Sequence, residues 1–282
     1  MNIEPNNLYC GDAYELIKSI PDKSVDLVII DPPYELCIGG KGHGALAERC
    51  DLRNKQIYSL SKERKEYINY YNKHGTDAES VRLRHHADKV EQRKSLKFIS
   101  TGISNDILDE LVRVMKKINI YIWCSRLQLR QLLDYFGDLN CNLDLITWHK
   151  KNAIPTCNNS YLSDTEYCVF ARAKGVKIYG SVESKRKYYI TGCNLVDKQN
   201  YKHPTIKPLN IIKNLIINSS NENDIVLDCF MGSGTTCVGA KELNRRYIGI
   251  EINPEFYKIA KDRLNGINAN GQTSIFTDFN NI

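Results

Sequence analysis

Two short polar motifs, each directly after an apolar run, constrain the fold of this chain of 282 residues more than any other feature. Asp31-Pro32-Pro33-Tyr34 follows the apolar residues 25–30, and a glycine turn at residues 228–236 follows the apolar residues 225–227. Short apolar runs of this kind are typical of buried strands, and parallel strands deliver ligand-binding residues at their carboxyl ends. Two such strand ends, about 200 residues apart in the chain, indicate two ligands that meet at one edge of a sheet.

Apolar runs and helical periodicities alternate along most of the chain. Strands are expected at residues 8–10, 25–30, 120–124, 143–148, 167–171, 225–230 and 247–251. Helices are expected from Asp12 to before Pro21 and at residues 107–117, 127–136, 208–217, 236–243 and 254–264. This alternation favours an α/β fold with a mostly parallel, doubly wound sheet.

Positive charge is concentrated in two segments, although the whole chain carries only +6. Residues 41–97 contain 14 Lys and Arg against 8 Asp and Glu, and residues 172–202 contain 8 against 2. Each segment therefore carries +6, and the rest of the chain is acidic. Clustered positive charge beside a sheet-edge site is typical of a nucleic-acid groove, whereas either stretch alone has solvated loops as its alternative.

Composition argues against several other classes of protein. No stretch approaches the ~18 apolar residues of a membrane span, and the polar N-terminus lacks the apolar core of a signal peptide. We therefore expect an intracellular protein without membrane contact. The ten cysteines form no C-x-x-C pair, which predicts reduced core thiols and no metal site.

The glycine turn predicts a cofactor site. Gly232 and Gly234 lack a Cβ, so the backbone can approach a ligand, and the following helix presents free N–H groups to a carboxylate or phosphate. No Lys precedes Thr235, so the turn is not a P-loop, and a plain tight connection is the alternative. Glu251 ends the next expected strand, where an acidic side chain binds ribose hydroxyls or, alternatively, caps the next helix. The expected ligand is therefore a nucleoside that carries a carboxylate rather than phosphates, and S-adenosylmethionine is such a molecule.

The Asp31-Pro32-Pro33-Tyr34 motif predicts the chemistry. Two consecutive prolines keep the backbone extended and leave the neighbouring carbonyl groups as rigid acceptors. Asp31 adds a carboxylate and Tyr34 a flat aromatic face, which together match an exocyclic amino group on a planar base. A base reaches such a site only after it leaves the double helix. A proline-rich turn without chemistry is the alternative.

Both motifs resemble those of the S-adenosylmethionine-dependent DNA amino-methyltransferases, specifically the permuted beta group in which the catalytic motif precedes the cofactor motif. Further matches in the expected order are Gly11-Asp12, Trp148-His149-Lys150, Thr165-Glu166-Tyr167 and residues 203–208. The resemblance covers most of the chain except the two basic segments and the tail. It implies a seven-stranded, Rossmann-like, circularly permuted sheet in which the strand at 8–10 lies beside that at 247–251, and that at 25–30 beside that at 225–230.

The resemblance also implies roles for individual residues. The catalytic residues are Asp31, Pro32, Pro33 and Tyr34. The cofactor-binding residues are Asp12, Thr205, Lys207, Asp228, Phe230, Gly232, Ser233, Gly234, Thr235 and Glu251. Asp12 would lie near the cofactor adenine, with helix capping as its alternative, and Asp228 near the cofactor amino group. Residues 205–208 would close over the methionine carboxylate.

The implied reaction is methyl transfer from S-adenosylmethionine to the exocyclic N6 amino group of a flipped adenine. Hydrogen bonds to Asp31 and the Pro32 carbonyl would free the nitrogen lone pair, while Tyr34 stacks on the base. Asp at the position of Asp31 goes mainly with adenine and Ser mainly with cytosine, so cytosine-N4 methylation stays an alternative. RNA and protein-glutamine methyltransferases usually have the opposite motif order. A non-enzymatic DNA-binding protein on this scaffold would not be expected to retain Asp31 and the glycines.

The two basic segments predict contacts with double-stranded DNA. Residues 172–202 occupy the place of the family's target-recognition region and contribute Lys185, Arg186 and Lys187. The insert at 37–97 contributes Lys41, Arg82 and Arg84, with a dimerisation lid as its alternative, which leaves a homodimer open.

The expected organisation follows from these assignments. The expected domains are a methyltransferase domain at residues 1–36 and 98–265, a DNA-binding insert at 37–97, a target-recognition region at 172–202 and a weakly ordered tail at 266–282. Such an enzyme is expected in the cytoplasm of a bacterium or as a phage-encoded protein, acting on DNA in a restriction-modification setting.

Overall fold

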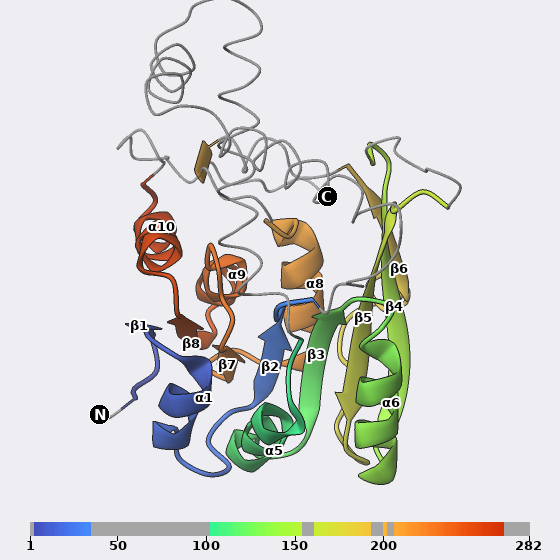
Figure 1. Ribbon diagram of the computed structural model, residues 1–282, viewed down its shortest axis with the longest axis horizontal. Coiled ribbons are helices and arrows are strands. Elements are labelled where there is room, and N and C mark those ends of the chain that lie inside the picture. Colours follow the sequence, from blue (N-terminus) through green and yellow to red (C-terminus); the bar gives the residue numbers. More distant parts are fainter. Residues whose placement is uncertain (1–2, 35–101, 154–160, 193–199, 202–205, 268–282) are drawn as a thin grey trace, which may run out of the picture. The chain divides into compact units, whose positions relative to one another are not determined.

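The computed structural model describes residues 3–34, 102–153, 161–192, 200–201 and 206–267 (Figure 1). By its internal contacts the chain divides into two units, Met1–Pro32 with Ile103–Ile282, and Pro33–Gly102. The described helices and strands belong to the first unit. The insert predicted at 37–97 and most of the tail lie outside the described residues, so the predicted domain boundaries remain predictions.

Within the described residues of the first unit, eight strands form one sheet, in the order β1-β8-β7-β2-β3-β5-β4-β6 (Figure 1). The strands are β1 (Asn7–Cys10), β2 (Leu27–Ile30), β3 (Asn119–Cys124), β4 (Asn142–Lys150), β5 (Thr165–Arg172), β6 (Tyr188–Thr191), β7 (Ile225–Asp228) and β8 (Arg246–Glu251). Every strand pair is parallel except those of β5 with β3 and with β4. The mostly parallel α/β sheet predicted from the sequence is confirmed.

The strand count differs from the seven predicted, because β6 adds an eighth strand at the edge of the sheet. Tyr188–Thr191 pairs in parallel with β4, inside the basic segment 172–202. Its four residues alternate between exposed and half-buried positions and follow a run of basic residues. A strand this short, with one face in solvent, lacks the apolar run that identified the other seven.

Helices cover both faces of the sheet, as the doubly wound topology requires (Figure 1). They are α1 (Ala13–Leu16) with the 3-10 turn η1 (Ile17–Ser19), α5 (Asn105–Val114), α6 (Leu129–Asp138), α8 (Leu209–Ser219), α9 (Thr235–Glu242) and α10 (Pro254–Leu264). Val28 and Ile30 of β2 pack into one core with α1, α5 and α6, whereas Leu27 and Ile29 pack into another with α8 and α9. Successive side chains of a strand point to opposite faces, so β2 is apolar throughout because both faces are covered.

Strands far apart in the sequence lie side by side in the sheet. β2 pairs with β7, with Val28 opposite Leu227, so Asp31 and the glycine turn leave adjacent strand ends. β1 pairs with β8, with Cys10 opposite Glu251. Both adjacencies predicted from the motif order are confirmed. Directly after β1, Asp12 accepts a hydrogen bond from the Tyr14 amide at 2.9 Å and is therefore the N-cap of α1.

No helix in the described part of the chain is long and apolar enough to cross a membrane.

Alanine substitutions at two glycines, one in the core and one on the surface, test how closely the side chains pack against the sheet. A Cβ on Gly249 of β8 would contact Met231, lie 2.7 Å from Leu8 Cδ2 and lie 2.8 Å from Cys237 Sγ, whereas a Cβ on Gly137 of α6 would meet nothing within 4 Å. We expect Gly249→Ala to lower the free energy of unfolding by about 1–3 kcal/mol because the core is overpacked. The matched Gly137→Ala should raise it by up to about 1 kcal/mol, since alanine favours the helix. Urea unfolding measures both, and equal effects would contradict this packing.

Candidate active site

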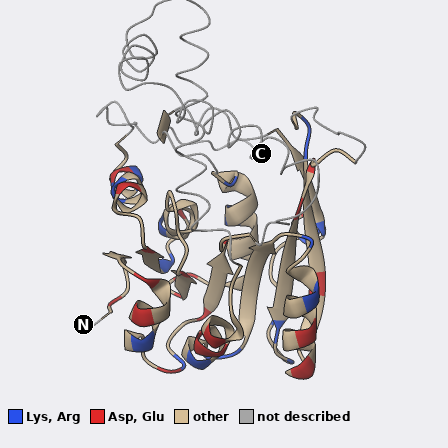
Figure 2. Ribbon diagram, in the orientation of Figure 1, with Lys and Arg blue, Asp and Glu red and all other residues tan. Residues whose placement is uncertain are grey.

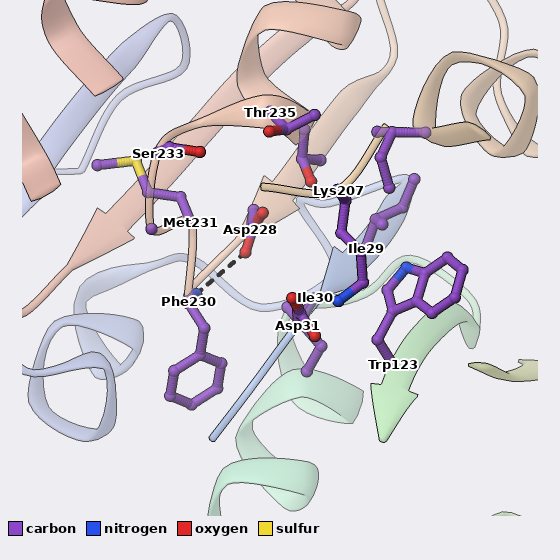
Figure 3. A pocket seen from close by; sticks show the side chains of 13 residues that line it. Ile29, Ile30, Asp31, Trp123, Lys207, Asp228, Phe230, Met231, Ser233 and Thr235 are labelled. Carbon is purple, nitrogen blue, oxygen red and sulfur yellow. Dashed lines mark hydrogen bonds and ion pairs between the residues drawn. The ribbon is translucent and has the colours of Figure 1, made fainter. Parts of the chain in front are cut away.

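A pocket opens at the carboxyl ends of β2 and β7, where the two sequence motifs meet (Figure 3). Its polar lining comes from Asp31 after β2, Lys207 before α8, and the turn between β7 and α9. Seven of the residues predicted from the sequence line it, namely Asp31, Lys207, Asp228, Phe230, Gly232, Ser233 and Thr235. Trp123 from the end of β3 adds an aromatic side chain that sequence reasoning did not select.

The glycine turn is tight for a steric reason. Gly232 and Gly234 have φ of +51° and +77°, in the left-handed region that side chains other than glycine rarely adopt. A Cβ on Gly234 would also lie 2.8 Å from the Ala260 Cβ of α10. The turn is fixed further by the Phe230 amide, which donates to Asp228 Oδ1 at 3.1 Å. Its conformation therefore requires glycine, as the sequence predicts.

Arg263 of α10 forms hydrogen bonds with the glycine turn, a role that the sequence did not predict. Its Nη1 donates to the Ser233 carbonyl at 2.8 Å, to Ser233 Oγ at 2.9 Å and to Thr235 Oγ1 at 3.0 Å. The guanidinium also lies 4.6 Å from the ring centroid of Tyr201. Arg263 is only 5% exposed, and a buried arginine is rare unless it is paired. In the sequence it is one more basic residue in the last turn of a helix, where a solvated position is the usual expectation.

Glu251 connects the end of β8 to the same turn. Its Oε2 accepts from the Gly232 amide at 2.9 Å, and its Oε1 accepts from the Asn253 amide at 2.9 Å. Burial raises the pKa of Glu251, while these N–H donors oppose the shift. Each carboxylate oxygen has a second lone pair, so Glu251 can also accept hydroxyl groups. Its predicted ribose-binding role remains a prediction. The alternative, a surface residue that caps the next helix, is wrong, because Glu251 is buried and the side chain of Asn253 is the N-cap of α10.

Asp228 is a buried acid at the end of β7. Burial raises its pKa to about 7, and the negative charges of Asp31 and Glu251 add to the shift. Hydrogen bonds from Thr236 and from the Phe230 amide oppose it. Around neutral pH the side chain is therefore divided between its neutral and ionised forms, and a cation in the pocket would favour the ionised form.

Asp31 is the first member of a series of ion pairs in which negative and positive side chains alternate. Lys207 Nζ lies 2.5 Å from Asp31 Oδ2 and 2.9 Å from Glu166 Oε2, and Lys150 Nζ lies 2.5 Å from Glu166 Oε1. Burial alone would raise the pKa of Glu166, but the ammonium groups of Lys207 and Lys150 outweigh it and lower the pKa to about 2. Burial would lower the pKa of Lys207, and the two carboxylates instead hold it above its ordinary value. Figure 3 shows Lys207 reaching over the pocket towards Asp31.

The other predicted residues fall in three groups. Gly234 and Glu251 adjoin the pocket through the turn, and Asp12 caps α1 beside β8. Pro32, Pro33 and Tyr34 follow Asp31 directly in the chain. Thr205, Lys41, Arg82 and Arg84 lie outside the described residues. Lys207, predicted to bind the cofactor carboxylate, is found on Asp31 and Glu166 instead, and its cofactor role remains a prediction.

The described basic residues predicted to contact DNA differ in their surroundings. Arg186 pairs with Glu183 at 2.6 Å, and Lys187 pairs with Asp144. Lys185 is exposed. Figure 2 shows Lys and Arg interspersed with Asp and Glu on α5, α6 and α10. These helices therefore carry both signs of charge, and the DNA contacts expected of the two basic segments remain predictions.

The raised pKa of Asp228 predicts a pH-dependent cost to the fold. Because the pKa is about 7 in the folded chain against an ordinary 3.8, ionisation of Asp228 costs stability as pH rises through this window. Asp228→Asn cannot ionise and keeps an oxygen that accepts from Phe230. We expect it to raise the free energy of unfolding by a few kcal/mol above pH 7, with the gain disappearing near pH 4. Urea unfolding across pH measures this, with the exposed Asp138→Asn as control, and a gain independent of pH would contradict the assignment.

Comparisons with known proteins agree with this geometry. Residues 25–262 match the family model described as DNA methylase. Type II methyltransferase M2.LlaDCHI of Lactococcus lactis subsp. cremoris is 31% identical over 90% of this chain and 87% of its own length. Type II methyltransferase M2.DpnII of Streptococcus pneumoniae is 30% identical over 92% of this chain and 89% of its own.

A solved structure has the same fold. The crystal structure of the M1.HpyAVI-SAM complex superposes with a TM-score of 0.60 at 24% identity, over 92% of this chain and 99% of the other. Since the family model spans most of the sheet and its helices, and the relatives align over nearly their whole length, the chain belongs to the DNA methylase family and is a DNA methyltransferase.

Proposed function

We propose that this methyltransferase transfers a methyl group from S-adenosylmethionine to the exocyclic N6 amino group of an adenine that is flipped out of double-stranded DNA. The observation that carries the proposal is the pocket in which Asp31 meets the turn from Asp228 to Thr235. The methyl acceptor and the methyl donor must lie within reach of each other, and adjacent strand ends provide this.

The residues of the pocket fit the cofactor. The turn offers backbone close to a ligand, Glu251 keeps acceptor capacity for ribose hydroxyls, and the buried Asp228 suits an ammonium group. Asp228, Gly232, Gly234 and Glu251 would therefore hold the nucleoside and the amino acid part. When bound, S-adenosylmethionine supplies an electrophilic methyl group on its sulfonium. The transfer therefore requires no covalent intermediate with the enzyme.

Asp31 provides the acceptor for the amino group of the base. An adenine N6 is a weak nucleophile because its lone pair is delocalised into the ring. Hydrogen bonds from its N–H groups to the Asp31 carboxylate and the Pro32 carbonyl favour a pyramidal nitrogen. The new N–C bond would form as the C–S bond breaks with its electron pair on sulfur, and the methylated nitrogen would then pass one proton to water. The products are N6-methyladenine and S-adenosylhomocysteine.

Asp31 also supports the choice of base, because aspartate at this motif position goes mainly with adenine. Cytosine-N4 methylation is the second candidate, since the same acceptor arrangement accommodates another exocyclic amino group. We further propose that the segments 37–97 and 172–202 grip the DNA, with Lys185, Arg186 and Lys187 in the second segment. Homodimerisation stays a proposal without a described interface.

Methyl transfer to DNA tests the proposal directly. We expect tritium from labelled S-adenosylmethionine to enter unmethylated bacterial genomic DNA and to appear as N6-methyladenine after nucleoside analysis. Asp31→Ala should lower the rate by about 100-fold or more, because the amino group loses a charged acceptor. Label in N4-methylcytosine would favour the second candidate, and full activity of Asp31→Ala would contradict the mechanism.

A further inference from the structure

The alternating charges around Asp31 come from four separate parts of the chain. Lys150 ends β4, Glu166 lies in β5, Lys207 precedes α8, and Asp31 follows β2. The Lys207 side chain is 10% exposed and that of Glu166 17% exposed. Removing such charges from water is unfavourable, and pairing in good geometry offsets this cost. Two cations and two anions in alternation satisfy this condition, with no net charge.

The groups that face Asp31 give Lys207 a specific task. In the described residues these groups are the ammonium of Lys207, the carboxyl of Asp228 from β7, and the thiols of Cys124 and Cys168 from β3 and β5. Asp228 and the low-polarity surroundings disfavour a negative charge on Asp31, and Lys207 favours it. Among these groups, the Lys207 ammonium is therefore the one that favours an ionised Asp31.

Glu166 determines that position from the other side. Its Oε2 attracts the same ammonium at 2.9 Å, so Lys207 is shared between two carboxylates rather than committed to Asp31. Lys150 in turn balances the second oxygen of Glu166. A carboxylate has about four lone-pair sites, so Asp31 can hold one ammonium and still accept an N–H from a base. Because Glu166 shares the Lys207 ammonium, Lys207 competes less strongly with the base for the Asp31 oxygens.

We propose that Lys207 and Glu166 are positioning residues for methyl transfer: Lys207 keeps Asp31 ionised and oriented, and Glu166 prevents Lys207 from occupying Asp31 completely. The proposal rests on the proposed function, because it takes Asp31 to be the acceptor for the amino group. It differs from a cofactor contact of Lys207, which would change the affinity for S-adenosylmethionine rather than the pH dependence of methyl transfer.

The test is the pH profile of single-turnover methyl transfer to unmethylated bacterial genomic DNA at saturating S-adenosylmethionine. Without the ammonium group, Asp31 takes up a proton more readily, so Lys207→Met should move the acidic limb of the profile upward by one pH unit or more. Lys207→Arg keeps the charge and should restore the limb. Glu166→Gln should lower the plateau several-fold without an upward shift, because Lys207 then pairs with Asp31 alone.

A matched control lies at the other end of β2, the strand that Asp31 follows. Lys116 Nζ pairs with Asp26 at 2.7 Å just before β2, so Lys116→Met removes a Lys–Asp pair away from the pocket and should leave the pH profile unchanged. Thermal unfolding checks that each variant folds, and the Glu166→Gln and Lys207→Arg arms remain decisive if Lys207→Met does not. An unshifted limb in Lys207→Met, or an unchanged plateau in Glu166→Gln, would overturn the proposal. Absence of N6-methyladenine with the unaltered protein would instead overturn the proposed function.

Discussion

The parallel pairing of β2 with β7 is the constraint on which the rest of the structure depends. It brings Asp31 and the glycine turn, which are far apart in the sequence, to neighbouring strand ends. The pairing is stable because β2 is buried on both faces, with one apolar core on each side. Burial of apolar side chains thus fixes the backbone of the two strands, and this backbone determines where the polar residues that follow each strand lie.

Charge balance is the second requirement of the site. Burial raises the pKa of Asp228 to about 7, and the negative charges of Asp31 and Glu251 add to this shift. Burial would also raise the pKa of the half-buried Glu166, but the ammonium groups of Lys207 and Lys150 outweigh it and lower this pKa to about 2. Arg263 is another buried cation, and it donates hydrogen bonds to carbonyl and hydroxyl oxygens of the glycine turn. The site therefore combines a turn that requires glycine with acids whose ionisation depends on burial and on a few specific partners.

The sequence predicts the strands, the adjacency of the two motifs and most of the pocket, because each rests on a local signal. Apolar runs identify buried strands, and Gly232 and Gly234 identify a turn that side chains do not fit. β6 and Arg263 were missed, because a half-exposed strand and an inward-facing arginine have no local pattern of their own. The Lys207–Glu166 pair was missed because it joins segments that only the folded sheet brings together.

A crystal structure of the protein with S-adenosylhomocysteine would locate the ligand relative to both strand ends. We expect the ribose hydroxyls within hydrogen-bonding distance of Glu251, the amino acid part against the turn from Asp228 to Thr235, and the sulfur directed towards Asp31. A ligand bound away from Glu251, or with its sulfur on the side opposite to Asp31, would contradict this expectation.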